Sequence, residues 1–197
     1  LIGNQSWMAK NLKATHYRDG TEILTGASDE DWSTYNSPAY GVYDDDPANV
    51  EIFGNLYNWY AVDDSRGICP ENWHVPSDDE FKTLEMFLGM SDGEVNIVGY
   101  RGTNEGSKLA GNADLWWDGD LENNSEFGTS QFNATSSGQR NDSGYQYMYG
   151  TNYLWSSSEI ADSERIYGRG IYHGLSTIGR WEDYLKIYGH SIRCIQD

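Results

Sequence analysis

The stretch Ile68 to Phe81 reads ICPENWHVPSDDEF and brings a cysteine, two prolines, a tryptophan and a helix start close together. Its counterpart is SIRC, Ser191 to Cys194, which holds the only other cysteine of the chain. Each cysteine lies beside apolar residues, so we expect the last strand to return against the helix that follows Pro76. Two alternatives arise for the thiols: a bond between Cys69 and Cys194, which we expect, or two buried free cysteines. Such a bond favours a secreted or cell-surface location.

A helix is predicted directly after the second proline of this stretch. Ser77 is followed three residues later by Glu80, the capping-box pattern in which the two side chains satisfy free backbone amides of the first turn. Phe81, Leu84 and Leu88 then recur at helical spacing, and a glycine follows. One amphipathic helix is therefore expected, and the sequence SDGE a few residues later allows a second, shorter one.

The composition describes one loop-rich domain with an aromatic core. The 197 residues include 22 glycines, 8 tryptophans and 15 tyrosines, and a chain of this length buries roughly 70 % of its unfolded surface. The net charge of −18 repels phosphate, which argues against nucleic acids and anionic membranes as partners. No apolar run of about 18 residues occurs, so this segment is not expected to insert into a membrane. The chain begins at Leu1 without a leader, and we expect it to be part of a longer precursor.

The sequence predicts a single domain, residues 1–197, with two regions. Residues 1–66 form a loop-rich N-terminal layer that contains a buried strand at Phe53 to Val62. Residues 67–197 contain the helix, a turn at Arg101 to Asn112, a long aromatic loop region and a meander of short antiparallel strands. The predicted strands of the meander are Tyr153 to Ser157, Arg165 to Tyr172, Ile178 to Tyr184 and the closing strand Ser191 to Ile195. The fold class is therefore α+β, with one or two helices and long ordered loops.

Eight blocks spread along the chain match a known pattern in the same order. They are Gly3–Leu12, Tyr43–Asn49, Gly54–Trp59, Cys69–Ser77, Arg101–Leu109, Phe127–Ser130, Trp155–Glu159 and Ser191–Cys194. Together they resemble the Fibrobacter succinogenes major paralogous domain and cover nearly the whole chain. The resemblance implies a C-type-lectin-like fold on a secreted or surface-anchored bacterial protein, mostly of Bacteroidetes, and names no ligand. Domains with that fold close in the manner expected for the two cysteines.

The segment before the closing strand also resembles the variable region of proteins diversified by retroelements, in which a lectin-like scaffold displays an altered surface. Its mixture of residues suits a binding surface, since rings give rigid contact area and polar groups adapt their hydrogen bonds. Strand alternation places the odd-numbered residues of Arg165 to Ile171 on one face, which we take as the ligand-facing one. The predicted ligand-binding residues are Tyr167, Arg169, Tyr172, His173, Trp181 and Tyr184. The alternative is that these rings are ordinary surface and core aromatics.

Signatures of catalysis or metal binding are absent or weak. The four histidines lack metal-ligand spacing, and no nucleophile elbow, phosphate loop or dinucleotide fingerprint occurs. Asp44 to Asp46 offer carboxylate oxygens to calcium, although a Pro-terminated acidic turn explains the run as well. We expect no cofactor apart from this weak calcium candidate, and no enzyme activity. A formylglycine-generating-type oxidase is a remote alternative from fold analogy, and it requires two reactive cysteines.

These observations predict an extracellular ligand-recognition module, either adhesin-like or a diversified receptor-binding protein. Its partner would be a protein or a glycan on another cell or on a phage surface, bound through the C-terminal aromatic surface. The alternative is a structural surface module without a defined pocket, in which the aromatic residues only stabilise the fold.

Overall fold

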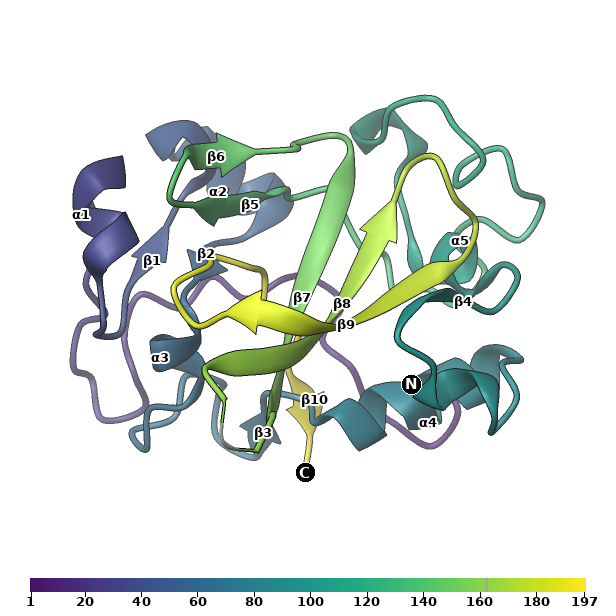
Figure 1. The fold of residues 1–197 in the computed structure, drawn as a ribbon, viewed down its shortest axis with the longest axis horizontal. Coiled ribbons are helices and arrows are strands. Elements are labelled where there is room, and N and C mark those ends of the chain that lie inside the picture. The colour runs from purple at the N-terminus through teal and green to yellow at the C-terminus, as the bar shows by residue number, and fades with distance from the viewer. Residues whose placement is uncertain (162) are drawn as a thin grey trace.

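The computed structural model describes residues 1–161 and 163–197 and has a four-stranded antiparallel sheet at its centre (Figure 1). The strand order of this sheet is β4-β9-β8-β7, and the two-stranded sheets β1-β2, β3-β10 and β5-β6 lie around it. The helices are α1 (Asp29–Thr34), α2 (Ala48–Phe53), α3 (Trp59–Val62), α4 (Asp78–Leu88) and α5 (Glu105–Leu109), with 3₁₀ turns at Tyr43–Asp45, Glu94–Asn96 and Ala113–Leu115. The strands are β1 (Tyr40–Gly41), β2 (Leu56–Tyr57), β3 (Trp73–His74), β4 (Gly99–Arg101), β5 (Gln139–Asn141), β6 (Gly144–Gln146), β7 (Thr151–Glu159), β8 (Arg165–Tyr172), β9 (Ile178–Leu185) and β10 (Ile195–Gln196).

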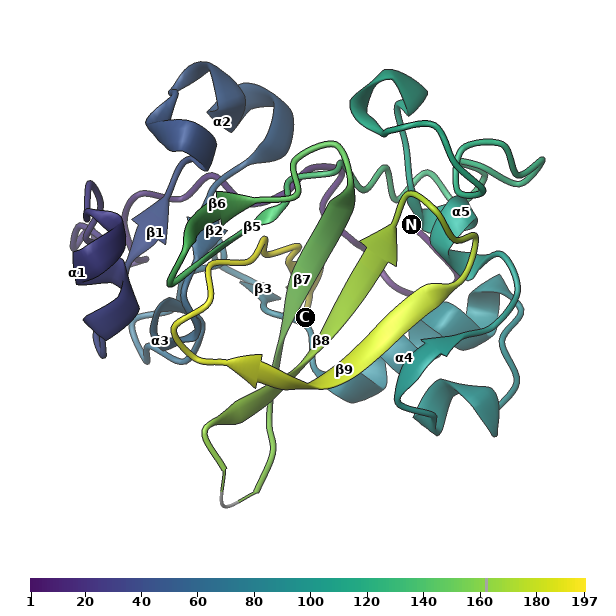
Figure 2. The same cartoon turned by 45° about the horizontal axis from the view of Figure 1, so that its top comes forward.

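The helix predicted after the second proline is confirmed as α4, which lies along one side of the central sheet (Figure 2). The hydroxyl of Ser77 accepts a hydrogen bond from the backbone amide of Glu80 (3.2 Å), and the Glu80 carboxylate accepts one from the Ser77 amide (2.7 Å). Such a cap contributes about 1 kcal/mol to stability. The apolar stripe that includes Phe81 and Leu84 is buried against the sheet. Local sequence signals therefore fix both the start of α4 and the side that it buries.

The chain closes as expected, through a disulfide and a short antiparallel pair. Cys69 and Cys194 are bonded, with an S–S distance of 2.04 Å and a Cα–Cα distance of 6.0 Å. Beside this bond β10 pairs with β3, so that Ile195 lies opposite His74. The closing strand is shorter than predicted, because only Ile195–Gln196 forms the ladder.

The three strands predicted in the C-terminal third are confirmed, with small changes at their ends. β7, β8 and β9 pair as neighbours in one antiparallel meander. β4 extends the sheet beyond β9 and was not expected from the sequence. The turn predicted at Arg101 to Asn112 is wrong, because Glu105–Leu109 forms helix α5. The Ser107 amide of α5 donates to the carbonyl of Ser176 (3.0 Å), so this short helix depends on contacts distant in sequence.

The strand predicted at Phe53 to Val62 is also wrong. The segment is divided into the end of α2, the strand β2 and the helix α3. Gly54 has a φ of 77°, which ends α2, and the Asn58 side chain accepts a hydrogen bond from the Ala61 amide (3.2 Å), which begins α3. A short aromatic run suits a buried helical turn as well as a strand. The described chain thus contains more helices than the one or two predicted, and every helix except α4 has six residues or fewer.

Two buried apolar clusters form the core. One joins α4 to the central sheet and includes Leu84, Leu154 and Ile178. The other surrounds the disulfide and includes Trp59 and Trp155. In the part of the chain that the structure describes, no helix is both long and apolar enough to cross a membrane.

A buried network of ion pairs fixes α4 against the sheet. Arg169 of β8 donates to Glu85 Oε1 (2.6 Å) and to Asp78 Oδ1 (2.8 Å). Arg180 of β9 donates to Asp78 Oδ2 (2.8 Å), and Arg101 of β4 donates to Glu85 Oε2 (2.5 Å). Burial by itself raises the pKa of Asp78, but the hydrogen bond from Arg180 and the charge of Arg169 outweigh it and hold that pKa well below its ordinary value. Three strands therefore each contribute an arginine to one helix.

Candidate functional site

The central sheet has an inner face toward α4 and an outer face, and strand register assigns each position to one of them. Arg101, Arg169 and Arg180 bond to α4, so their positions belong to the inner face. Neighbouring positions point the opposite way, because side chains alternate along a strand. The outer positions that lie opposite one another across the four strands are Tyr100, Gly179, Gly170 and Tyr153.

Aromatic rings occupy the outer face. Trp181 of β9 packs edge-on against Tyr100 of β4, with ring centroids 5.3 Å apart and an interplanar angle of 87°. Tyr100 is 45 % exposed and Tyr172, at the end of β8, is 36 % exposed. Tyr153 of β7 and Trp181 are half-buried. We call Tyr100, Tyr153, Tyr172 and Trp181 the aromatic sheet face.

Two loops extend this surface at one edge. The ring of His173 lies 4.5 Å from that of Tyr172 and 5.4 Å from that of Trp117. Trp117, in the loop after the 3₁₀ turn Ala113–Leu115, and Tyr147, in the loop between β6 and β7, are both more than half exposed. Among the residues that the structure describes, six aromatic side chains are at least 36 % exposed, and four of them belong to the aromatic sheet face or this edge. Exposed rings that gather in this way mark an interaction surface more strongly than scattered ones do.

Glycines form the floor beneath Trp181. A Cβ atom on Gly170 would lie 2.9 Å from Trp181 Nε1, and one on Gly179 would lie 2.5 Å from the same nitrogen. The indole therefore rests on backbone that a larger residue would obstruct. A ring supported this closely has little freedom to lose, which lowers the entropic cost of binding a ligand through it.

The structure brings together three of the six predicted ligand-binding residues. Tyr172 and Trp181 belong to the aromatic sheet face, and His173 lies at its edge. That these residues contact a ligand stays a prediction.

Arg169 is wrong as a surface anchor. Its guanidinium has no exposed surface and is bonded to Asp78 and Glu85. The predicted alternation of β8 holds from Gly168 onward, beyond a bulge that interrupts the ladder after Ile166. However, the side of β8 that we predicted to face the ligand, which includes Arg169, is the inner side. The alternate positions, which include Gly170, face outward.

Tyr184 and Tyr167 also leave the candidate surface. Tyr184 is only 7 % exposed, and it packs edge-on against Tyr153 (5.8 Å between centroids) and His190 (4.5 Å). Tyr167 lies apart from the aromatic sheet face. The guanidinium of Arg180 stacks over its ring, 4.3 Å from the ring centroid. Both tyrosines pack against other residues of the sheet and lie outside the aromatic sheet face.

Sequence reasoning missed Tyr100 and Tyr153 of this surface. Tyr153 lies in a predicted strand, but its face follows from pairing with Gly170, and single-sequence patterns do not give register. Tyr100 lies in β4, which has three residues and no alternation long enough to detect. A stronger signal was available from Gly168 and Gly170, because glycines at alternate strand positions indicate close approach by another group.

His190 is buried against Trp155 and Tyr184, at the end of the outer face that other residues cover. Its ring centroid lies 4.5 Å from those of Trp155 and Tyr184 and 5.1 Å from that of Tyr153. Nε2 is 3.2 Å from Gln139 Oε1, and the residue has no exposed surface. Burial lowers the pKa of His190 to about 3. The ring is therefore neutral at pH 7, with the Nε2 proton donated to Gln139.

We expect acid to destabilise the protein through His190. An unfolded chain takes up this proton near pH 6.5, as free histidine does, whereas the folded chain takes it up at about pH 3. The contribution of His190 to stability is therefore complete above pH 6.5 and is lost as the pH falls from 6.5 toward 3. Urea unfolding measures the free energy of unfolding of wild type and of His190→Phe. When the pH falls from 7 to 5, wild type should lose about 2 kcal/mol of stability relative to the variant. A difference that does not change with pH contradicts a buried neutral ring.

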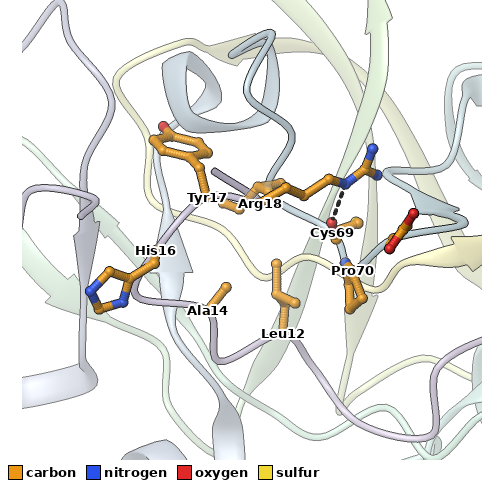
Figure 3. A pocket seen from close by; sticks show the side chains of 9 residues that line it. Leu12, Ala14, His16, Tyr17, Arg18, Cys69 and Pro70 are labelled. Atoms are coloured by element: carbon orange, nitrogen blue, oxygen red, sulfur yellow. Dashed lines mark hydrogen bonds between the residues drawn. The ribbon is translucent and has the colours of Figure 1, made fainter. Parts of the chain in front are cut away.

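A cavity of about 570 Å³ opens beside the disulfide, among residues of the N-terminal layer and the segment that precedes β3 (Figure 3). Leu12 and Ala14 give it an apolar side. Arg18 crosses it and donates from Nε to the Cys69 carbonyl (2.8 Å). A second nitrogen of Arg18 bonds the Trp73 carbonyl, so this cation serves the loop that holds the disulfide. None of the six predicted ligand-binding residues lines the cavity.

The acidic run and the cysteines have structural roles. Asp45 accepts a hydrogen bond from the Tyr145 hydroxyl (2.7 Å), and Asp46 Oδ1 accepts one from the Ala48 amide (3.0 Å) at the start of α2. Across residues 1–161 and 163–197, no group of three or more His, Cys, Asp or Glu side chains is placed to hold a metal ion. Neither cysteine is free, since both form the disulfide.

The fold and its surface define the class of this protein: it is an α/β domain closed by a disulfide, with aromatic rings displayed on one face of an antiparallel sheet. The chain belongs to the Fibrobacter succinogenes major domain family, whose family model matches residues 1–196. The resemblance carried by the eight sequence blocks is thereby confirmed. No curated protein and no solved structure matches the chain.

Proposed function

We propose that this domain is a non-enzymatic, extracellular ligand-recognition module that binds a protein or a glycan through the aromatic sheet face. The supporting observation is the gathering of exposed rings on one side of a sheet whose other side is held to α4 by buried ion pairs. Rings supply large contact area at small entropic cost. A rigid sheet keeps that area in place.

The disulfide and the charge support a location outside the cell. Cys69 and Cys194 form a bond of the kind that persists in oxidising compartments, which is compatible with a secreted or cell-surface bacterial protein. A net charge of −18 favours ligands that are neutral or cationic, such as an uncharged glycan or a basic protein patch on another cell or a phage.

The proposal includes a C-type-lectin-like fold for the domain. It is supported by a helix that starts soon after the first cysteine, by a closing strand that pairs with β3 just before that helix, and by a bond from the first cysteine to the residue before the closing strand. A diversified variable region between the blocks Trp155–Glu159 and Ser191–Cys194 is a narrower form of the proposal. It requires, beside the gene, a near-copy of the 3′ coding end that differs at adenines, together with a reverse transcriptase; a genome without that copy removes this form alone.

Two alternatives predict different measurements. In a structural surface module the rings only stabilise the fold, so alanine at Trp181 lowers the melting temperature without affecting any binding. In an oxidase of the formylglycine-generating type, Cys69 and Cys194 are reactive thiols of low pKa, and thiol titration of the native protein finds both of them.

We expect Trp181→Ala to remove ligand binding and leave the protein folded. Loss of a central ring from a binding surface costs about 2 kcal/mol or more, which weakens affinity at least about thirtyfold. Binding is measured on an array of glycans and by pulldown of surface proteins from the neighbouring microbial community, and folding by circular dichroism.

Phe87→Ala is the matched control for this test, because Phe87 is 62 % exposed on α4, outside the aromatic sheet face. It should leave both readouts unchanged. Equal binding by the Trp181 variant and the control would contradict the proposed surface, and a melting temperature lowered without any effect on binding would favour the structural alternative.

A further inference from the structure

A second cavity, of about 410 Å³, lies between the N-terminal segment around Lys10 and the loops around Asn112 and Asn133. It is lined by residues of the N-terminal segment, of α2, of these loops and of the chain just before β10, where Arg193 lies. No residue of the aromatic sheet face takes part in the lining. A cavity of this size suits a small molecule, at the lower end of the usual range for ligand sites.

The floor of this cavity contains a buried cation without a counter-charge. Arg193 has no exposed surface, and in the described part of the chain it bonds to neutral acceptors. These include Asn11 Oδ1 (2.6 Å) and the carbonyls of Phe132 (2.5 Å) and Met8 (3.2 Å). A fully buried arginine is rare unless it is paired with an acid. Although burial lowers the pKa of Arg193 to about 9, the guanidinium is still charged at pH 7.

The remaining lining adds a second cation and several polar groups. Lys10 is exposed at the cavity. Asn112, Asn133 and Thr135 contribute amide and hydroxyl groups. The one acid in the lining, Glu51, accepts a hydrogen bond from Lys13 Nζ (2.7 Å), so its charge is largely offset.

Among the described residues, few cations are without an ion pair, and two of these few line this cavity. Eight of the 13 basic residues form an ion pair with an aspartate or glutamate. Within residues 1–161 and 163–197, the five without such a pair are Lys10, Arg18, Lys108, Arg165 and Arg193. In a chain with a net charge of −18, a cavity lined by two cations without an ion pair is unusual.

We infer that this cavity binds a carboxylate-bearing small molecule the size of a sugar acid or an amino acid. The carboxylate of the ligand contacts Lys10 and lies above the buried Arg193. The charge of Arg193 has no counter-ion, and it attracts the carboxylate strongly because the protein interior screens charge weakly at short range. The amide and hydroxyl groups of Asn112, Asn133 and Thr135 meet the polar remainder of the ligand. This site is separate from the aromatic sheet face, so either can exist without the other.

The direct test is calorimetric titration of the intact domain with sodium glucuronate and with sodium N-acetylglycinate, each compared with its uncharged counterpart, glucose or N-acetylglycinamide, at equal ionic strength. Binding of a carboxylate at least about tenfold tighter than of its counterpart is the expected result, and the arm that binds identifies the source as sugar acid or amino acid. The inference is overturned if the uncharged compounds bind equally well, or if neither carboxylate binds at 10 mM, roughly the weakest range of a specific small site.

Two exposed charges allow a sharper test without disturbing the fold. Lys10→Gln should weaken carboxylate binding about three- to tenfold, and Glu51→Gln should strengthen it about two- to fivefold. Arg165→Gln, which removes an exposed cation from β8, should leave affinity unchanged. If Lys10→Gln and Glu51→Gln both behave like Arg165→Gln, the carboxylate site is wrong. Loss of Trp181 should not alter this binding, which separates the test from that of the proposed function.

Discussion

Glu85→Gln should destabilise the protein by about 3–5 kcal/mol, because it removes one of the two carboxylates that compensate three buried arginines. Glu85 has no exposed surface and accepts from Arg169 (2.6 Å) and Arg101 (2.5 Å). Glutamine has nearly the same shape, so the change removes charge and leaves no cavity. Arg101 then keeps no carboxylate within the network, and Arg169 keeps only Asp78.

The loss is measured as the free energy of unfolding in urea. It should appear as a fall of about 6–20 °C in melting temperature for a domain of this size. Glu182→Gln is the matched control, since Glu182 lies exposed on β9, and it should change stability by no more than about 0.5 kcal/mol. Equal stability of the two variants would mean that α4 is held to the sheet by apolar contacts alone.

The same network explains which part of the site could be predicted from sequence. The positions of β8 alternate as expected, but arginines in a strand normally indicate the solvent side, and here Arg169 belongs to the inner one. A signal for this inversion exists in α4. Asp78 and Glu85 fall on the same helical stripe as Phe81 and Leu88, so acids occupy the side that must be buried. Buried acids require buried cations, and the arginines of the meander supply them.

Elements fixed by local chemistry could be predicted, and elements fixed by distant contacts could not. The start of α4 depends on Ser77 and Glu80, which lie three residues apart, and so the capping box identified it. By contrast, Tyr100 reaches the aromatic sheet face only because β4 pairs with β9, whose residues lie some eighty positions later. Helix α5 depends in the same way on the loop that holds Ser176. A short element whose partner lies far along the chain leaves no periodic signal in its own sequence.

Loss of the disulfide should lower stability by about 4–5 kcal/mol, since the bond joins residues 125 apart and closes a long loop in the unfolded chain. The double variant Cys69→Ala/Cys194→Ala gives this value directly in urea unfolding. Both sulfur atoms are buried, so wild-type protein should be reduced in denaturant and refolded with the reductant present. Reduced wild type and the double variant should then unfold at similar urea concentrations, and the reductant should have no effect on the variant.

This measurement also tests where the protein works. A domain of ordinary stability has about 5–15 kcal/mol in total, so loss of this bond would remove a large share of it. A chain that depends on the bond in this way is maintained in an oxidising compartment, whereas one that folds equally well when reduced has no such requirement. If native protein contains two titratable thiols, or if reduction leaves the urea midpoint unchanged, then Cys69 and Cys194 do not stabilise the closure of the chain and the extracellular proposal loses its main support.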